Sequence, residues 1–532
     1  MNRHDSDPLH AATNAKLAAV VETSPSQPNR PPGAACRSQH SVKIVTACGM
    51  FLVLAVTLLV RAANPTVHSL LWAEQPRSDS AAGTPRPGAV EITNVPPQPV
   101  SLDTALKQIP VETRALVLVD ARLCKLIASD LLAYVRAASA RRHFHIALLP
   151  VVRLDDYTPP QIRHALQGWW TARPGLEGIV FVGNVKLPSF FMPRADTPST
   201  RLWPRYFEDL DMTAQRQIQP GTILKECGAG QPWPCVAGAK GFKVPEHDFD
   251  GFVPGPSKGP QLWAAFLPVG YQDDAKNNYD GWAEQLTPFL KKVQAFYDGT
   301  TSYGRGLYLV SNDISCLARS KPVWDAVGPK QIEFFSINEK GPGAYKNNPA
   351  GYLRVDLTKY GSLEEFLAYA GKLPWMDEGW QSAEVFLGNM KESRRRFVWW
   401  NVHSNSELSL VSSKQAFAMT NGGLIALLSG CSVGGFRQPG SKSFADIQTA
   451  PENNVLVSVV YGRSSFLAAL GTPHNRVNDE HATPLFKHMY ANGYLGKAHL
   501  LRLREQDEDS LDPGSLRGRQ EMLIGDPFLD VR

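Results

Sequence analysis

The chain has 532 residues, of which 43% are hydrophobic and 20% charged. This composition supports a sizeable folded core and excludes both a single small module and wholesale disorder. Its 55 Lys and Arg against 50 Asp and Glu give a net charge of +5, too small an excess at this length for a nucleic-acid-binding protein, so we expect no DNA or RNA partner. The seven cysteines are too few for a disulfide-built scaffold, and their odd number leaves one thiol free or paired between chains.

One segment near the N-terminus is apolar enough to enter a membrane. Residues 44–60 carry no charge and are bounded by Lys43 and Arg61, a length at the short end of what spans a bilayer. Basic residues gather before the segment rather than after it, which predicts a single-pass signal anchor with a cytoplasmic N-terminus and an exported remainder. Two alternatives stay open, cleavage after the small residues 62–63 and lipidation at Cys48; neither changes the side of the membrane.

The segments around this span divide the chain by composition. Residues 1–42 are polar and rich in Ser and Pro, which is typical of a disordered cytoplasmic tail. The signal anchor occupies 43–61, and the Pro-rich stretch 62–100 predicts an extended linker. The remaining residues, 101–532, form one predicted folded domain, interrupted at 187–260 by a long loop insertion rich in Pro, Gly and aromatic residues.

The start of this domain alternates between strand and helix patterns. Residues 115–119 are a short apolar run ended by Asp120, and helical spacing of Leu side chains follows up to the Arg pair at 141–142. A second strand at 144–152, a helix opened by two prolines at 159–160 and a third strand at 178–182 continue the alternation. This order predicts an α/β fold with a mostly parallel sheet flanked by helices.

Similar patterns recur towards the C-terminus. Apolar runs predict further strands at 306–310, 397–402, 423–428 and 455–461. Helices are expected at 282–297 and 362–372.

Two of these later strands run directly into residues that carry chemistry. His403 follows the strand that ends at Val402, and Cys431 follows the strand that ends at Leu428. In a parallel sheet both ends emerge at the same edge, the usual place for a ligand crevice. A thiolate is a strong nucleophile, and a neighbouring imidazole lowers the thiol pKa or protonates a leaving amine. The pattern is compatible with a Cys/His dyad, although spacing alone favours a buried structural cysteine and a structural histidine.

Several motifs together resemble the catalytic domain of gingipain-type cysteine peptidases. The sequence ALLSGCSVGGFRQPGSKSFAD at 426–446 is similar to the nucleophile region of that family, and WNVHSNSE at 400–407 to its histidine segment. FVGNVKLP at 181–188 and YFEDLD at 206–211 resemble two further family segments, and the ending IGDPFLDVR at 524–532 resembles its "GDPSL" ending. Order and spacing agree over residues 110–532.

The resemblance implies a caspase-like fold and the hydrolysis of protein or peptide substrates by a cysteine endopeptidase that requires no cofactor. His403 and Cys431 fall on the catalytic positions of the motifs. Main-chain amides around Gly430 and Ser404 are candidates for the oxyanion hole. Tyr461 and Ser464 are candidates for the substrate groove.

The sequence also departs from the family pattern. The residues on either side of the histidine are Val402 and Ser404, where the family has glycine, and a Cβ restricts the backbone at both positions. A catalytically inactive caspase-like domain that binds a peptide or an envelope protein is therefore the alternative function. The residues before the YFEDLD segment are Trp203, Pro204 and Arg205 rather than an acidic residue, so we do not expect cleavage after Arg or Lys.

Two further expectations concern the insertion. Its acidic residues could hold a structural calcium ion, although no EF-hand spacing is present; the candidate ligands are Asp209, Asp211, Asp248 and Asp250. Cys227 and Cys235 enclose a short loop in the exported region, where disulfides persist, and could pair with each other.

Overall fold

The computed structural model describes residues 97–192, 199–226, 235, 241–253, 255–257, 259–267, 278–301, 303–311, 315–337, 352–370, 395–401, 424–428, 457–461, 482–509 and 521–531. All of them belong to the second of two units into which the chain divides, Pro87–Arg532. Val100 forms an isolated parallel bridge with Val151, and the first regular element, the 3₁₀ helix η2 (Leu102–Gln108), follows it.

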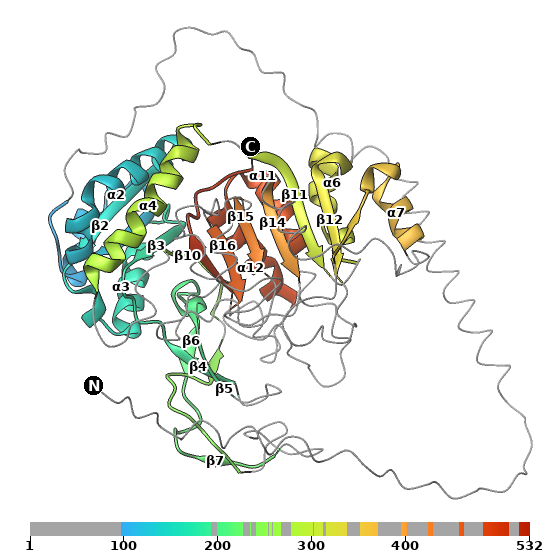
Figure 1. Ribbon diagram of the computed structural model, residues 1–532. Coiled ribbons are helices and arrows are strands. Elements are labelled where there is room, and N and C mark those ends of the chain that lie inside the picture. The colour runs from blue at the N-terminus through green and yellow to red at the C-terminus, as the bar shows by residue number, and fades with distance from the viewer. Residues whose placement is uncertain are drawn as a thin grey trace, which may run out of the picture. The chain divides into compact units, whose positions relative to one another are not determined.

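A single large sheet organises this unit. Within the described residues it has eleven strands, in the order β13-β12-β11-β14-β15-β16-β17-β10-β3-β1-β2 (Figure 1). Neighbouring strands are parallel except in two pairs, β16 with β17 and β12 with β13. The predicted α/β fold with a mostly parallel sheet flanked by helices is therefore confirmed.

The antiparallel pair of β16 and β17 divides the sheet into two halves that run in opposite directions. The N-terminal half consists of β2, β1, β3 and β10, and β17 runs parallel to its neighbour β10. The C-terminal half consists of β16, β15, β14, β11 and β12, which are all parallel to one another, with β13 antiparallel at the end. The two halves therefore present the carboxyl ends of their strands at opposite edges.

Local sequence signals account for most of the N-terminal half. Asp120 caps the first helix by accepting a hydrogen bond from the amide of Arg122 (2.9 Å). Thr158 and Gln161 form a capping box where two prolines open the next helix. The elements are β1 (Thr113–Asp120), α2 (Ala121–Arg142), β2 (His145–Val151), η3 (Leu154–Asp156), α3 (Pro159–Ala172), β3 (Gly178–Val182) and β10 (Trp263–Phe266).

The C-terminal half includes neighbouring strands that are not consecutive in the sequence, since β11 lies beside β14. All four strands predicted there exist, with boundaries that differ by a residue or two. The strands are β11 (Gly304–Ser311), β12 (Ile332–Ile337), β13 (Tyr352–Val355), β14 (Arg395–Asn401), β15 (Ile425–Leu428), β16 (Val457–Tyr461) and β17 (Glu521–Gly525). The helices around them are α4 (Tyr279–Tyr297), α5 (Ser315–Arg319), α6 (Lys321–Val327), η5 (Pro329–Gln331), η6 (Leu357–Lys359), α7 (Leu363–Ala370), α11 (Ala482–Asn492) and α12 (Leu495–Asp509).

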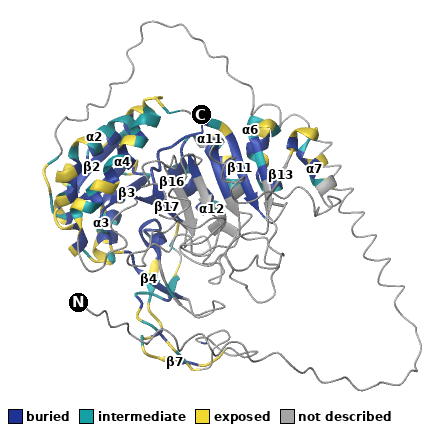
Figure 2. Ribbon diagram, viewed as in Figure 1, coloured by how far each residue is buried: buried dark blue, intermediate teal, exposed yellow. Residues whose placement is uncertain are grey.

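Side chains alternate between the two faces of the sheet and build a core on each. In β1, Val117 and Val119 pack with α2, α4, α11 and α12, whereas Leu116 and Leu118 pack with η2, α3 and the insertion. Figure 2 shows the strands as the most buried elements, with exposed residues on the outer sides of α2, α3 and α4. Both faces of the sheet are covered, as the continuous apolar strands predict.

The insertion lies outside the central sheet, as its composition predicts. It forms three two-stranded antiparallel sheets in the described residues, β4 (Ser189–Met192) with β5 (Ser199–Leu202), β6 (Thr213–Gln215) with β9 (Gly251–Val253), and β7 (Ile223–Leu224) with β8 (Phe242–Lys243). The short helix η4 (Pro204–Phe207) connects it to the main core. Around η4, the aromatic side chains of Trp203, Tyr206 and Phe207 are buried against the same face as α3.

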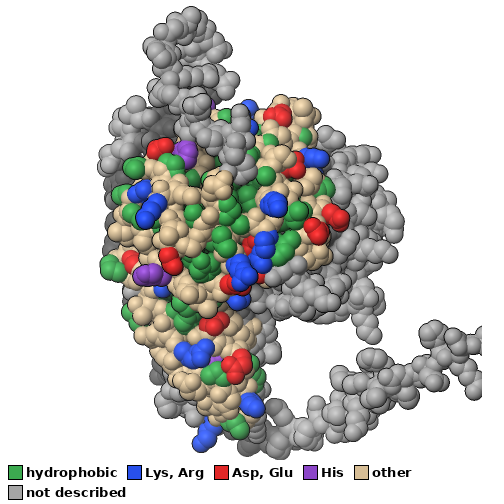
Figure 3. All heavy atoms as spheres, turned by 90° about the vertical axis from the view of Figure 1, so that its left-hand side faces the viewer, with side chains coloured by type: hydrophobic (Ala, Val, Ile, Leu, Met, Phe, Trp, Pro, Cys, Tyr) green, Lys and Arg blue, Asp and Glu red, His purple; other side chains and the backbone are tan. Residues whose placement is uncertain are grey.

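On the visible surface over the N-terminal half, charged side chains of both signs are interspersed (Figure 3). On the face shown in Figure 3, basic and acidic side chains alternate with hydrophobic ones. The large hydrophobic side chains that are most exposed, such as Val111 and Leu126, are single and scattered, which is normal for a protein surface.

Candidate active site

The strands that precede the predicted dyad are neighbours in the sheet. β14 and β15 are parallel, and Trp400 of β14 pairs with Leu428 of β15. His403 and Cys431 each come three residues after one member of this pair in the sequence. The two strands therefore end level with each other at one edge of the sheet, where polar residues from neighbouring loops usually meet.

All but one of the predicted catalytic, oxyanion and groove residues lie outside the described residues. These are His403, Ser404, Gly430, Cys431 and Ser464. Tyr461 is the last residue of β16, which neighbours β15, and its main chain pairs with Glu521 at the start of β17. The predicted groove residue Tyr461 therefore lies at the carboxyl end of β16, at the same edge as the ends of β14 and β15.

The insertion reaches the same edge from the other half of the sheet. Because β17 is antiparallel to β16 and parallel to β10, the amino ends of β17 and β10 lie at the edge where β14, β15 and β16 have their carboxyl ends. Glu208, directly after η4, holds the amino end of β10: its main-chain oxygen accepts hydrogen bonds from the amides of Gln261 (2.9 Å) and Leu262 (3.1 Å), and its carboxylate accepts one from the amide of Ala264 (3.1 Å).

A buried histidine lies next to this glutamate. The Nε2 of His499, in α12, lies 3.4 Å from Oε1 of Glu208. On the other side of the ring, Nδ1 of His499 lies 2.8 Å from Nη2 of Arg502. Burial lowers the pKa of His499 to about 4, so the imidazole is neutral near pH 7. Glu208 and His499 lie 291 positions apart in the sequence, so no sequence pattern pairs them; only the fold brings α12 and η4 together.

Two of the four candidate calcium ligands, Asp209 and Asp211, take part in hydrogen bonds with α3 and within the insertion. The main-chain oxygen of Asp209 accepts a hydrogen bond from Arg163 (2.8 Å). Asp211 accepts hydrogen bonds from the amide and the hydroxyl of Ser257 (2.9 and 2.6 Å) and from Gln261 (3.1 Å). Burial raises the pKa of Asp211, but these hydrogen bonds outweigh burial and hold the pKa below its usual value.

The other two candidate calcium ligands accept hydrogen bonds from groups within the insertion. Asp248 accepts hydrogen bonds from the amide and the hydroxyl of Ser189 (both 2.7 Å), and Asp250 accepts them from the amides of residues 217 and 218 (2.8 and 2.6 Å). In the described part of the chain, no three His, Cys, Asp or Glu side chains are grouped so that they could hold a metal ion. The carboxylates of Asp211, Asp248 and Asp250 accept hydrogen bonds that fix the turns of the insertion.

Two cysteines are described in full. Cys235 is disulfide-bonded, and its predicted partner Cys227 lies outside the described residues. Cys124, in α2, is a free thiol buried in the core, and burial raises its pKa to about 11. A thiol of this kind is protonated and inert near neutral pH, so Cys124 is not a competing nucleophile.

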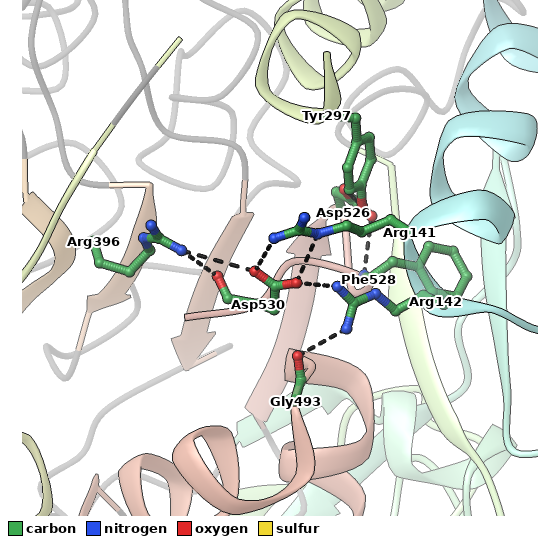
Figure 4. Close-up of polar contacts among 8 residues, drawn as sticks. All are labelled: Arg141, Arg142, Tyr297, Arg396, Gly493, Asp526, Phe528 and Asp530. Atoms are coloured by element: carbon green, nitrogen blue, oxygen red, sulfur yellow. Dashed lines mark hydrogen bonds and ion pairs between the residues drawn. The ribbon is translucent and has the colours of Figure 1, made fainter. Parts of the chain in front are cut away.

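The ending that resembles "GDPSL" is a buried polar centre (Figure 4). We refer to residues 526–531 as the C-terminal segment. Its Asp526 accepts hydrogen bonds from the hydroxyls of Tyr134 (2.9 Å) and Tyr297 (2.6 Å) and is wholly buried. Burial raises the pKa of Asp526 to about 6 even though the hydrogen bonds act against it.

Comparison with known protein families, with curated proteins and with solved structures finds no match to this chain. Among the described residues, no helix is long and apolar enough to cross a membrane, and the predicted signal anchor at 44–60 lies outside them.

Proposed function

We propose that the chain is an exported, membrane-anchored cysteine endopeptidase with a caspase-like catalytic domain, in which Cys431 is the nucleophile and His403 the general acid/base. The observation that carries this proposal is the pairing of β14 with β15, with Trp400 level with Leu428. It supports the two residues lying side by side, because each follows its strand by the same number of residues. The motif resemblance to gingipain-type peptidases supports the same pair.

The chemistry requires only these two side chains and main-chain amides. The Cys431 thiolate attacks the scissile carbonyl carbon, and amides near Gly430 and Ser404 stabilise the oxyanion of the tetrahedral intermediate. The C–N bond then breaks as the His403 imidazolium protonates the leaving amine, which leaves a thioester. Water, deprotonated by the neutral imidazole, hydrolyses the thioester and regenerates the thiol. No metal or organic cofactor is required for these steps.

The alternative is a binding module that keeps the fold without the activity. Val402 and Ser404 favour it, since side chains at these positions restrict the backbone next to the imidazole. The two functions predict different reactivities for the Cys431 thiol. An activated cysteine reacts quickly with electrophiles near neutral pH, whereas a structural one does not.

Labelling of Cys431 decides between them. The full chain, purified in a mild detergent, is incubated with a library of peptidyl acyloxymethyl ketones, and the modified residue is identified by mass spectrometry alongside His403→Ala and Cys431→Ala. We expect labelling at Cys431 that falls at least about a hundredfold in His403→Ala, the scale of a general acid/base contribution. A folded protein whose Cys431 stays unlabelled, or is labelled equally without His403, supports the binding module instead.

The membrane location is tested separately. Residues 44–60 are proposed to span the membrane once, with the catalytic domain on the exported side. The full chain should then stay in the membrane fraction after an alkaline wash, and its catalytic domain should be digested by a protease added from the exported side only. Release by the wash would contradict the anchor without affecting the dyad.

A further inference from the structure

One strand joins the two halves of the sheet. β17 pairs with β16 in antiparallel orientation along its whole length, from Glu521 to Gly525, and with β10 in parallel orientation on its other side. Within the described part of the sheet, β17 is the only strand between β10 and β16. The sheet is therefore continuous through a single strand of five residues.

The C-terminal segment that follows β17 is bound by the start of α12. The amide of Leu495 donates to the main-chain oxygen of Leu529 (2.9 Å), and the amide of Gly496 donates to that of Pro527 (2.8 Å). The first amides of a helix have no partner within the helix, so the segment satisfies two of them. Both hydrogen bonds require the segment to be in place, and the two amides therefore report on its position.

The same segment is also bound by elements of the N-terminal half and by α4. The carboxylate of Asp526 accepts hydrogen bonds from Tyr134 of α2 and from Tyr297 of α4 (Figure 4). The ring of Phe528 packs edge-on against Trp263 of β10. These partners come from three different elements, so the segment gains its full set of contacts only after those elements have been brought together.

The order of the elements in the sequence adds a second observation. β17 follows every other described strand, and it pairs with β16 across residues 462–520 and with β10 across residues 267–520. Contacts across such stretches carry a larger closure entropy than the local contacts of β1, β2 and β3, and they form later. We propose that docking of β17 and the C-terminal segment is a separate closing step, which joins the C-terminal half to an N-terminal half that is already formed. The native protein reopens at this step before the N-terminal half unfolds.

The closing step also completes the edge at which the candidate site lies. That edge is formed by the carboxyl ends of β14, β15 and β16 together with the amino ends of β17 and β10. When β17 is undocked, one sheet no longer holds these strand ends, and β16 and β10 each have an unpaired side. The opened form therefore lacks the candidate site. This consequence rests on the proposed function, whereas the closing step does not.

Amide hydrogen exchange under native conditions tests the closing step. The full chain is studied in a mild detergent with its disulfide intact, and exchange is followed by mass spectrometry of fragments. The reporters are the amides of β17 and those of Leu495 and Gly496, and the reference is the set of amides in β1 and β2. We expect the reporters to exchange as one group, at least about tenfold faster than the reference, because partial opening requires less free energy than global unfolding. Equal rates for the two groups would overturn the proposal.

Two matched substitutions sharpen the test. Leu529 in the C-terminal segment and Leu166 in α3 are both fully buried. Leu529→Ala removes contacts that the opened form and the unfolded chain both lack, so exchange should accelerate about thirtyfold or more in reporters and reference alike. Leu166→Ala removes contacts between α3 and the sheet, which the opened form keeps. The reference should then accelerate by a similar factor, while the reporters keep their wild-type rates.

The response to Leu166→Ala decides the outcome. If it accelerates the reporters as much as the reference, the sheet opens as one unit and the inference is refuted. Should either variant fail to fold, the urea dependence of wild-type exchange gives the same decision. Below the unfolding transition, reporter exchange should rise with urea less steeply than reference exchange, because the closing step exposes less surface than global unfolding. Equal slopes would refute the closing step. Only main-chain amides are measured, so failure of the proposed peptidase function would leave these results unchanged.

Discussion

The two halves of the sheet differ in how far apart in the sequence their parts lie. In the N-terminal half, β1, β2 and β3 follow one another within residues 113–182, with a single α-helix in each connection. In the C-terminal half, β14, β15 and β16 are separated by stretches of similar length, but β11 pairs with β14 across residues 312–394 and β16 pairs with β17 across residues 462–520. The pairing of β1, β2 and β3 therefore follows local signals, whereas the pairs β11 with β14 and β16 with β17 need contacts between residues that are far apart. Local contacts form early and distant ones carry a larger entropy cost.

The largest expected effect comes from removing the C-terminal segment. Phe528, Leu529 and Val531 are buried, and Phe528 packs edge-on against Trp263, with ring centroids 5.5 Å apart. Each large side chain contributes about 2–5 kcal/mol, so deletion of residues 526–532 should remove a large part of the margin of about 5–15 kcal/mol that a folded domain has.

Amide hydrogen exchange in the deletion variant tests the comparison between the halves. We expect protection to be lost throughout β14, β15 and β16, while part of the protection between β1 and β2 persists, because those two strands are paired and covered by local helices. Equal loss of protection in both halves would show that the N-terminal half also depends on distant contacts.

A smaller effect is expected at a close approach within the N-terminal half. A Cβ at Gly178, the first residue of β3, would overlap the indole ring of Trp263 in β10. Gly178→Ala should therefore destabilise the protein by about 1–3 kcal/mol, as overpacking does, measured as a lower midpoint of urea unfolding. Gly175→Ala is the matched control, since nothing lies within 4 Å of its Cβ; equal midpoints for the two variants would contradict the overlap.

Gly178 also illustrates what the sequence could predict. Its strand was found with the observed boundaries, because an uninterrupted apolar run shows its type within five residues. β10, β12, β13 and β17 were not predicted, and length is not the reason, since β17 is as long as β3 and β12 is longer. The direction of the two halves was also beyond prediction, since periodicity carries no information on which strands pair.

The same division applies to the candidate site. The strand ends before His403 and Cys431 could be read from apolar runs that stop at polar residues, and the neighbouring, parallel arrangement of β14 and β15 agrees with that expectation. The contact of Glu208 with His499 could not be read in this way, because each is an ordinary charged or polar residue within its own segment. The sequence showed Asp530 only as part of a motif, and its ion pairs with Arg141, Arg142 and Arg396 are seen only in the fold.

The smallest effects concern pH and two buried groups, Asp526 and His499. The pKa of Asp526 is raised to about 6, so the native state holds this proton more tightly than the unfolded chain, and the contribution to stability is lost as the pH rises from about 4 to 6. The pKa of His499 is lowered to about 4, so its contribution is present above about pH 6.5 and is lost as the pH falls towards 4. The two contributions to stability change in opposite directions over the same pH range, so they largely cancel in the wild type.

Single variants should separate the two slopes. We expect Asp526→Asn, which mimics the protonated acid, to unfold at a urea midpoint that rises more steeply than the wild type's between pH 4 and 6, because the opposing slope of His499 remains. His499→Gln should show the reverse, a midpoint that falls relative to the wild type over the same range, because only Asp526 then titrates with a shifted pKa. If the urea midpoints of the wild type and both variants changed with pH in the same way, neither Asp526 nor His499 would have a shifted pKa, and burial of the two groups would carry no pH-dependent cost.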